Sequence, residues 1–93
     1  MSSPIVIYKT AACPYCVSAA RFLREVKGVA FQEVDLTGDY QGRQDLMRRS
    51  GRHTVPQIYI GETHVGGYDD LRALDRAGGL NPLLVREGLT PLR

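Results

Sequence analysis

Apolar residues in the first third of the chain form a strand-like run, a helical stripe and a second strand-like run. The run 5–8 (IVIY) is β-branched and aromatic with no polar face, which is typical of a central strand covered on both sides. The range 29–34 (VAFQEV) is less apolar, which predicts a second strand nearer a sheet edge. Between these runs, apolar residues at i, i+3, i+4 and i+7 predict an amphipathic helix that Gly28 ends: Ala19, Phe22, Leu23 and Val26. A strand, a helix and a strand in about 30 residues predict a βαβ unit with parallel strands.

The middle of the chain predicts a further helix followed by a hairpin. The range 40–50 carries only a thin apolar stripe, with Leu46 and Met47 facing inward and Gly51 as its end. The ranges 57–60 and 63–66 have strand composition, and the short link between them contains a glycine, which favours a hairpin.

The last third of the chain predicts one helix and a tail. Asp69 and Asp70 are typical of a helix N-terminus, and Gly78-Gly79 suits its end. The range 82–93 has two prolines and no clear period, so we expect a docked or loose tail. The element order β-α-β-α-β-β-α predicts an α/β fold with four strands in one mixed sheet and helices on both faces.

Size and charge limit the class of protein. Ninety-three residues correspond to one small domain, 1–93. Twelve basic residues face ten acidic ones and the two kinds are interspersed, which gives no indication of nucleic-acid binding. The sequence has no apolar run near the roughly 18 residues that a membrane span needs. The start MSSPIVIYKT lacks the features of a secretory signal, so we expect a cytoplasmic location.

Candidate chemistry lies in the stretch TAACPYCV, which holds both cysteines, Cys13 and Cys16. Two cysteines do not make a disulfide scaffold. A structural zinc site needs four ligands at short spacings, whereas only His53 and His64 could join the cysteines, so no metal is expected. These exclusions leave redox chemistry, or a pair of inert buried thiols.

The surroundings of the cysteine pair favour redox chemistry. Pro14 suits the first turn of a helix, and the residue before a proline prefers an extended conformation, so Cys13 is expected just outside that turn. Its sulfur then faces the free N–H groups and the positive end of the helix dipole. Thiols in such settings have pKa values of roughly 3.5–7.5 instead of about 8.5. Cys16, within the helix, is expected to be less exposed and to resolve a mixed disulfide formed on Cys13.

Three motifs in order resemble a dithiol glutaredoxin of the short bacterial type: CPYC, TVPQIYI from Thr54, and GGYDDL from Gly66. The resemblance covers about residues 4–84 and implies a thioredoxin fold. It also implies a glutathione-dependent disulfide oxidoreductase in which Cys13 attacks disulfides and Cys16 closes an intramolecular disulfide. Glutathione, as cosubstrate, then reduces the enzyme.

The resemblance further implies a set of glutathione-binding residues. A cis Val55–Pro56 turn presents backbone groups to glutathione, free N–H groups at Asp69 and Asp70 hold its γ-glutamyl end, and two cations can meet its glycine end. The implied set is Tyr15, Thr54, Val55, Pro56, Asp69, Asp70, Lys9 and Arg52. Many family members carry a lysine three residues before the first cysteine. Here that position is Thr10, and the one-residue shift of Lys9 turns its side chain to the other face of an extended segment.

Two alternatives stay open. One is a dimeric carrier that bridges a [2Fe-2S] cluster through Cys13 and glutathione. The other is a glutathione-independent electron donor to ribonucleotide reductase. The expected partners are glutathione and disulfide-bonded or glutathionylated proteins, ribonucleotide reductase among them, and the expected state is a monomer.

Overall fold

The computed structural model describes residues 3–93. Its strands are β1 (Ile5–Lys9), β2 (Gln32–Asp35), β3 (Gln57–Ile60) and β4 (Thr63–Gly66). Its helices are α1 (Pro14–Arg21), continued by the π-helical turn η1 (Phe22–Val26), then α2 (Tyr40–Ser50), α3 (Tyr68–Arg76) and α4 (Leu80–Arg86). The expected order β-α-β-α-β-β-α is therefore confirmed, with a further helix added.

The four strands form one mixed sheet in the order β2-β1-β3-β4. β1 pairs parallel with β2 and antiparallel with β3, and β3 pairs antiparallel with β4. The βαβ unit, the hairpin and the central place of β1 are thus as predicted. The second strand is shorter than predicted: residues 29–31 precede it without strand structure, and all four residues of β2 are exposed, as suits an edge.

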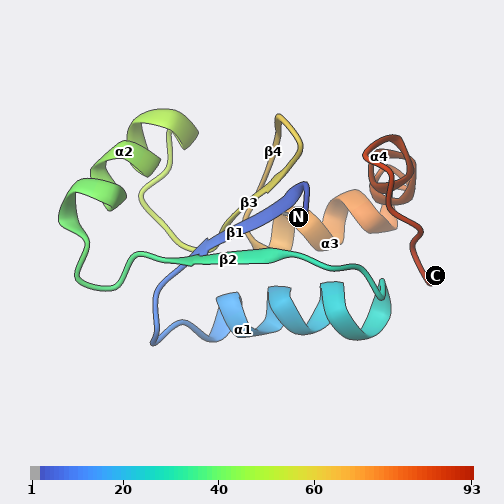
Figure 1. Ribbon diagram of the computed structural model, residues 1–93, viewed down its shortest axis with the longest axis horizontal. Coiled ribbons are helices and arrows are strands. Elements are labelled where there is room, and N and C mark those ends of the chain that lie inside the picture. Colours follow the sequence, from blue (N-terminus) through green and yellow to red (C-terminus); the bar gives the residue numbers. More distant parts are fainter. Residues whose placement is uncertain (1–2) are drawn as a thin grey trace.

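The core lies on one face of the sheet. Ile5 and Ile7 of β1 pair with Ile60 and Ile58 of β3, and all four side chains are fully buried. α1 and α3 cover this face, while α2 stands on the other side of the sheet (Figure 1). Leu71 of α3 and several residues of α1, η1 and α4 join the same core: Ala19, Phe22, Leu23, Leu80, Leu83 and Leu84.

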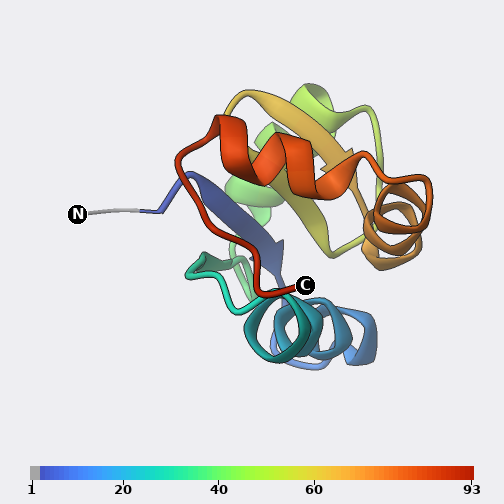
Figure 2. The same ribbon diagram turned by 90° about the vertical axis from the view of Figure 1, so that its right-hand side faces the viewer.

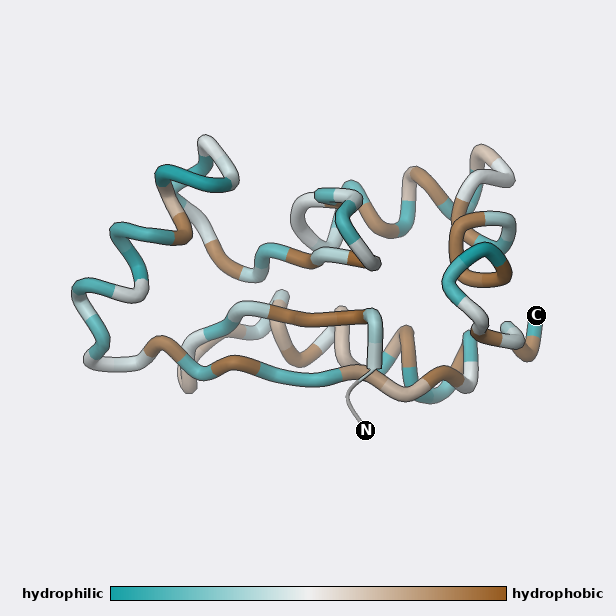
Figure 3. Tube along the Cα trace, turned by 45° about the horizontal axis from the view of Figure 1, so that its top comes forward, coloured by the Kyte–Doolittle hydropathy of each residue, from teal (hydrophilic) through white to brown (hydrophobic). Residues whose placement is uncertain are grey.

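The opposite face is covered thinly, by α2. This helix is largely hydrophilic (Figure 3), and Leu46 is its buried residue. The Arg49 guanidinium stands 4.8 Å from the ring centre of Tyr8 and 4.6 Å from that of Tyr59. Asp39 caps the start of α2 by accepting a hydrogen bond from the Gly42 N–H, and Gly51 ends it in the left-handed conformation, as expected.

The C-terminal segment is more ordered than the sequence suggested. Pro82 lies at the third position of α4, where its missing N–H breaks no helical hydrogen bond, so it starts the helix rather than preventing it. The residues after α4 run back to the end of η1 (Figure 2), where the Leu92 N–H donates to the Lys27 carbonyl oxygen across 2.7 Å. Lys27, only 3% exposed, binds Asp75, Asn81 and the Arg93 carbonyl oxygen. The range 82–93 is therefore a helix and a docked end.

Within residues 3–93, every helix is too short or too polar to cross a membrane.

Candidate active site

Cys13 is the N-cap residue of α1. Its backbone is extended (φ −135°, ψ 100°), and Pro14 occupies the first helical position, as the sequence predicts. The Cys16 N–H donates a hydrogen bond to Cys13 Sγ across 3.2 Å. The free N–H groups at the start of α1 therefore face this sulfur.

The two thiols are unequal. Both are free, and Cys13 is 9% exposed against 3% for Cys16. The Cys13 side chain is less exposed than the sequence suggested, because its Sγ lies 3.7 Å from the carbonyl oxygen of Val55, in the turn that precedes β3. Burial, followed by the hydrogen bond with Cys13, raises the pKa of Cys16 to about 12. Cys16 is therefore protonated at neutral pH and does not compete with Cys13 as the first nucleophile.

The turn beside Cys13 contains the cis peptide bond Val55–Pro56, as the resemblance implied. A buried side chain holds the turn: the Gln57 amide donates to the Thr54 carbonyl oxygen across 2.9 Å. Gln57 in turn pairs with the ring of His64 at 2.7 Å. Gln57 did not stand out in the sequence, because an amide within a strand gives no signal that it braces a preceding turn.

The start of α3 forms another side of the site. The Asp70 carboxylate accepts a hydrogen bond from the Gly67 N–H (2.8 Å) and one from Arg52 Nη1 (3.0 Å). These two donors, Gly67 first, lower the pKa of Asp70. Asp70 therefore caps the helix and orients Arg52, whereas the Asp69 side chain is exposed at the first turn.

These elements enclose a groove of about 250 Å³ beside Cys13. The structure brings together seven of the eight residues implied as glutathione-binding, together with Gly67 and Tyr68, which were not among them. The groove is lined by Tyr15, Arg52, Thr54, Val55, Pro56, Gly67, Tyr68, Asp69 and Asp70. Tyr15 is 61% exposed, so its ring forms an outer wall. The GGYDD motif contains Gly67 and Tyr68, and this was the signal that could have identified them.

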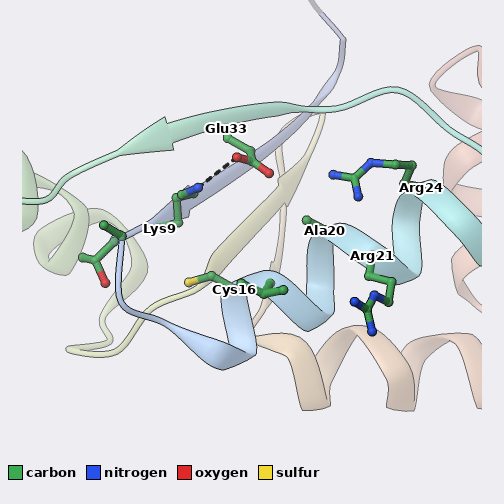
Figure 4. Close-up of a pocket in the computed structure, with 9 residues that line it drawn as sticks. Lys9, Cys16, Ala20, Arg21, Arg24 and Glu33 are labelled. Atoms are coloured by element: carbon green, nitrogen blue, oxygen red, sulfur yellow. Dashed lines mark hydrogen bonds and ion pairs between the residues drawn. The ribbon is translucent and has the colours of Figure 1, made fainter.

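Lys9 is the implied residue that lies elsewhere. Its Nζ forms an ion pair with Glu33 Oε2 at 3.0 Å, and both side chains line a separate pocket that Cys16 also lines (Figure 4). The Lys9 side chain thus points away from the groove, as expected from its shift by one residue along the strand.

The groove suits a small zwitterionic thiol compound. Backbone groups at Val55 can pair with an extended peptide, the N-terminus of α3 attracts a carboxylate, and Arg52 supplies a cation. The sulfur of Cys13 adjoins Val55, so a disulfide bound there lies within reach of attack.

Comparison with known proteins gives consistent results. Residues 5–65 match the Glutaredoxin family model. The chain is 58% identical over 81 residues to a glutaredoxin of Pseudomonas aeruginosa, covering 87% of this chain and 95% of that protein. It is 51% identical over 80 residues to glutaredoxin 3 of Escherichia coli K12, covering 86% and 95%.

Among solved structures, the crystal structure of a buckwheat glutaredoxin–glutathione complex superimposes with a TM-score of 0.85 at 29% identity. The match covers 94% of this chain and 81% of that one. The expected thioredoxin fold is confirmed.

Proposed function

This chain belongs to the glutaredoxin family. We propose which residues of its groove bind glutathione and which step of the reaction each of its two thiols performs. It is a glutathione-dependent thiol–disulfide oxidoreductase. The comparisons favour this activity over a cluster carrier or a glutathione-independent donor.

Glutathione occupies the groove beside Cys13. The Val55 backbone pairs with its cysteine residue, as one strand pairs with another. Its γ-glutamyl carboxylate lies at the free N–H groups of α3, with Asp69 meeting the amino group. Arg52 binds the glycine-end carboxylate, and Tyr15 and Thr54 border the ligand. The presence of these residues in one groove supports the assignment, and the buckwheat relative was crystallised with glutathione.

The reaction starts at Cys13. Its thiolate attacks the glutathione sulfur of a mixed disulfide, so a new S–S bond forms and the old one breaks. The electron pair of the broken bond leaves with the substrate thiolate, which takes up a proton. A second glutathione then attacks the enzyme-bound disulfide, or Cys16 closes an intramolecular disulfide that glutathione later reduces. The single observation that carries this role for Cys13 is its Sγ at the helix N-terminus beside the groove.

The natural substrates are glutathionylated and disulfide-bonded proteins, of which ribonucleotide reductase is one candidate, and the enzyme acts as a monomer in the cytoplasm. The exposed rim at Tyr15 leaves space for a protein chain attached to the glutathione sulfur.

Turnover of a glutathionylated peptide tests the proposal. In the presence of glutathione and an NADPH-dependent glutathione reductase, Cys13→Ser abolishes turnover, whereas Cys16→Ser retains it because the route through glutathione needs one thiol. Equal activity of the two variants would contradict the proposal.

A further inference from the structure

Cys16 lines a pocket that is separate from the groove. This pocket has a volume of about 180 Å³ and lies between α1 and the strands β1 and β2 (Figure 4). A cavity needs about 10–15 Å³ to hold a water, so several fit here. Its lining residues are all different from those of the groove: Lys9, Thr10, Ala11, Cys16, Val17, Ala20, Arg21, Arg24 and Glu33.

Lys9 stands over this pocket because of its place in β1. Side chains alternate along a strand, so Lys9 lies on the same face as the buried Ile5 and Ile7, toward α1. The ion pair with Glu33 of the neighbouring strand keeps its ammonium there rather than in open solvent, and the Lys9 side chain is 28% exposed.

The other charged groups of the pocket are engaged elsewhere. Arg21 pairs with Glu25 at 3.7 Å on the outer side of α1, and the Arg24 guanidinium stands 5.5 Å from the ring centre of Phe31. Among the groups acting on Cys16, burial and Cys13 raise its pKa, while the Thr10 backbone and the charge of Lys9 lower it.

The balance of these effects changes during the reaction. Once Cys13 carries glutathione, its sulfur is neutral and no longer opposes ionisation of Cys16 by charge. The positive charge of Lys9 is unaffected by that step. A thiol with a pKa of about 12 is ionised in only about one molecule in 10⁵ at pH 7, so each charge that acts on Cys16 changes how often its thiolate is available to react.

Building on the function proposed above, we propose that Lys9, held in place by Glu33, stabilises the Cys16 thiolate and so promotes the dithiol route. The Cys16 thiol gives its proton to water in the pocket, and its sulfur attacks Cys13 Sγ. The Cys13–Cys16 bond forms as the bond between Cys13 and glutathione breaks. The electron pair leaves with the glutathione thiolate, which takes up a proton. Lys9 is a positioning residue for Cys16 and has no part in binding glutathione.

The test follows closure of the intramolecular disulfide directly. Reduced protein is mixed with glutathione disulfide and quenched with acid at intervals, and mass spectrometry resolves the mixed disulfide from the intramolecular one. Lys9→Met is expected to slow the conversion at pH 7 and to move its pH profile higher, because the cation that lowers the pKa of Cys16 is lost. Lys9→Arg keeps the charge and retains most of the rate.

Arg24→Met is the matched control, because it removes a cation that lines the same pocket but stands on Phe31, and closure is expected to be unchanged. Equal slowing by Arg24→Met, or normal closure in Lys9→Met, overturns the inference.

The Cys16→Ser background separates this inference from the proposed function. There, Lys9→Met is expected to leave turnover of the glutathionylated peptide unchanged. A loss in that background would place Lys9 at glutathione and overturn the inference. An inactive Cys16→Ser parent would contradict the proposed function itself, and the inference would fall with it.

Discussion

The backbone N–H of Cys16 donates to the Sγ of Cys13 across 3.2 Å, so the two members of the dithiol are joined before any disulfide forms. The bond exists because Cys13 is the N-cap and Cys16 lies in the first turn that it caps. It holds the first nucleophile at the helix N-terminus while the second thiol stays buried and protonated. The asymmetry of the pair is therefore a property of one helical turn.

The raised pKa of Cys16 predicts a loss of stability in alkali. Its pKa lies at about 12 in the folded protein against 9.0 without the fold. The folded value is the higher one, so the contribution is fully present below pH 9 and is lost as pH rises toward 12. With both thiols reduced, we expect the wild type to lose its stability advantage over Cys16→Ala as pH rises through this window. The difference in their free energies of unfolding should shrink by up to about 1.4 kcal/mol per pH unit. Urea unfolding of the two proteins at several pH values measures it, and a constant difference would contradict it.

Asp70 is expected to serve both the helix and the groove. Asp70→Ala removes the acceptor of the Gly67 N–H, which costs about 1 kcal/mol of stability. It also frees Arg52, so KM for a glutathionylated peptide rises more than kcat falls. Because the pKa of Asp70 is lowered in the folded protein, its contribution is present above the usual carboxyl pKa and is lost as pH falls below it. The stability difference from Asp70→Asn should therefore shrink in acid. Glu62→Gln, at an exposed position outside the groove, controls for the loss of one negative charge.

Removing the charge of Lys27 is expected to lower the free energy of unfolding. Lys27→Met leaves Asp75 and two oxygen acceptors, on Asn81 and Arg93, without their donor. We expect a loss of about 2–3 kcal/mol, below the ~3–5 kcal/mol for fully buried pairs because Asp75 reaches solvent. The double variant Lys27→Met/Asp75→Asn should recover part of this loss. A change under about 0.5 kcal/mol in urea unfolding would show that the docked C-terminal end contributes little.

Gly66 is expected to tolerate no side chain. Its φ is +112°, and a Cβ there would lie 2.5 Å from Asp70 Oδ2 and 3.1 Å from Arg52 Nη1. Gly66→Ala should therefore disturb the groove as well as strain the backbone. Gly38→Ala is the matched control, with φ +74° and nothing within 4 Å of its Cβ, so it pays only the roughly 1–2 kcal/mol of left-handed strain. Comparable KM values for the two variants would contradict a role for Gly66 in shaping the groove.

The sequence was sufficient to predict the helix ends that depend on neighbouring residues alone. The step from Cys13 to Pro14 sets the start of α1, and Gly51 ends α2. These features depend on neighbouring residues only, and each lies where it was predicted.

Features that depend on tertiary packing were either predicted wrongly from the sequence or not predicted at all. Val29 is buried without belonging to a strand, so its apolar character extended the predicted strand too far. Pro82 suggested an end to regular structure, although a proline in the first turn of a helix is compatible with it. The brace from Gln57 to Thr54 joins a buried amide to a turn, and no spacing rule predicts that contact.

The exposed edge strand β2 has a consequence for how copies of the molecule behave together. Its outer side offers unpaired backbone groups to any other extended chain, and two of its four residues, Glu33 and Asp35, carry negative charge. Glu33 is paired with Lys9, so the charge that repels a second such edge is that of Asp35. Hydrogen bonds with Thr37 hold the pKa of Asp35 below its usual value, so this repulsion persists into mild acid and keeps strands of different molecules from pairing.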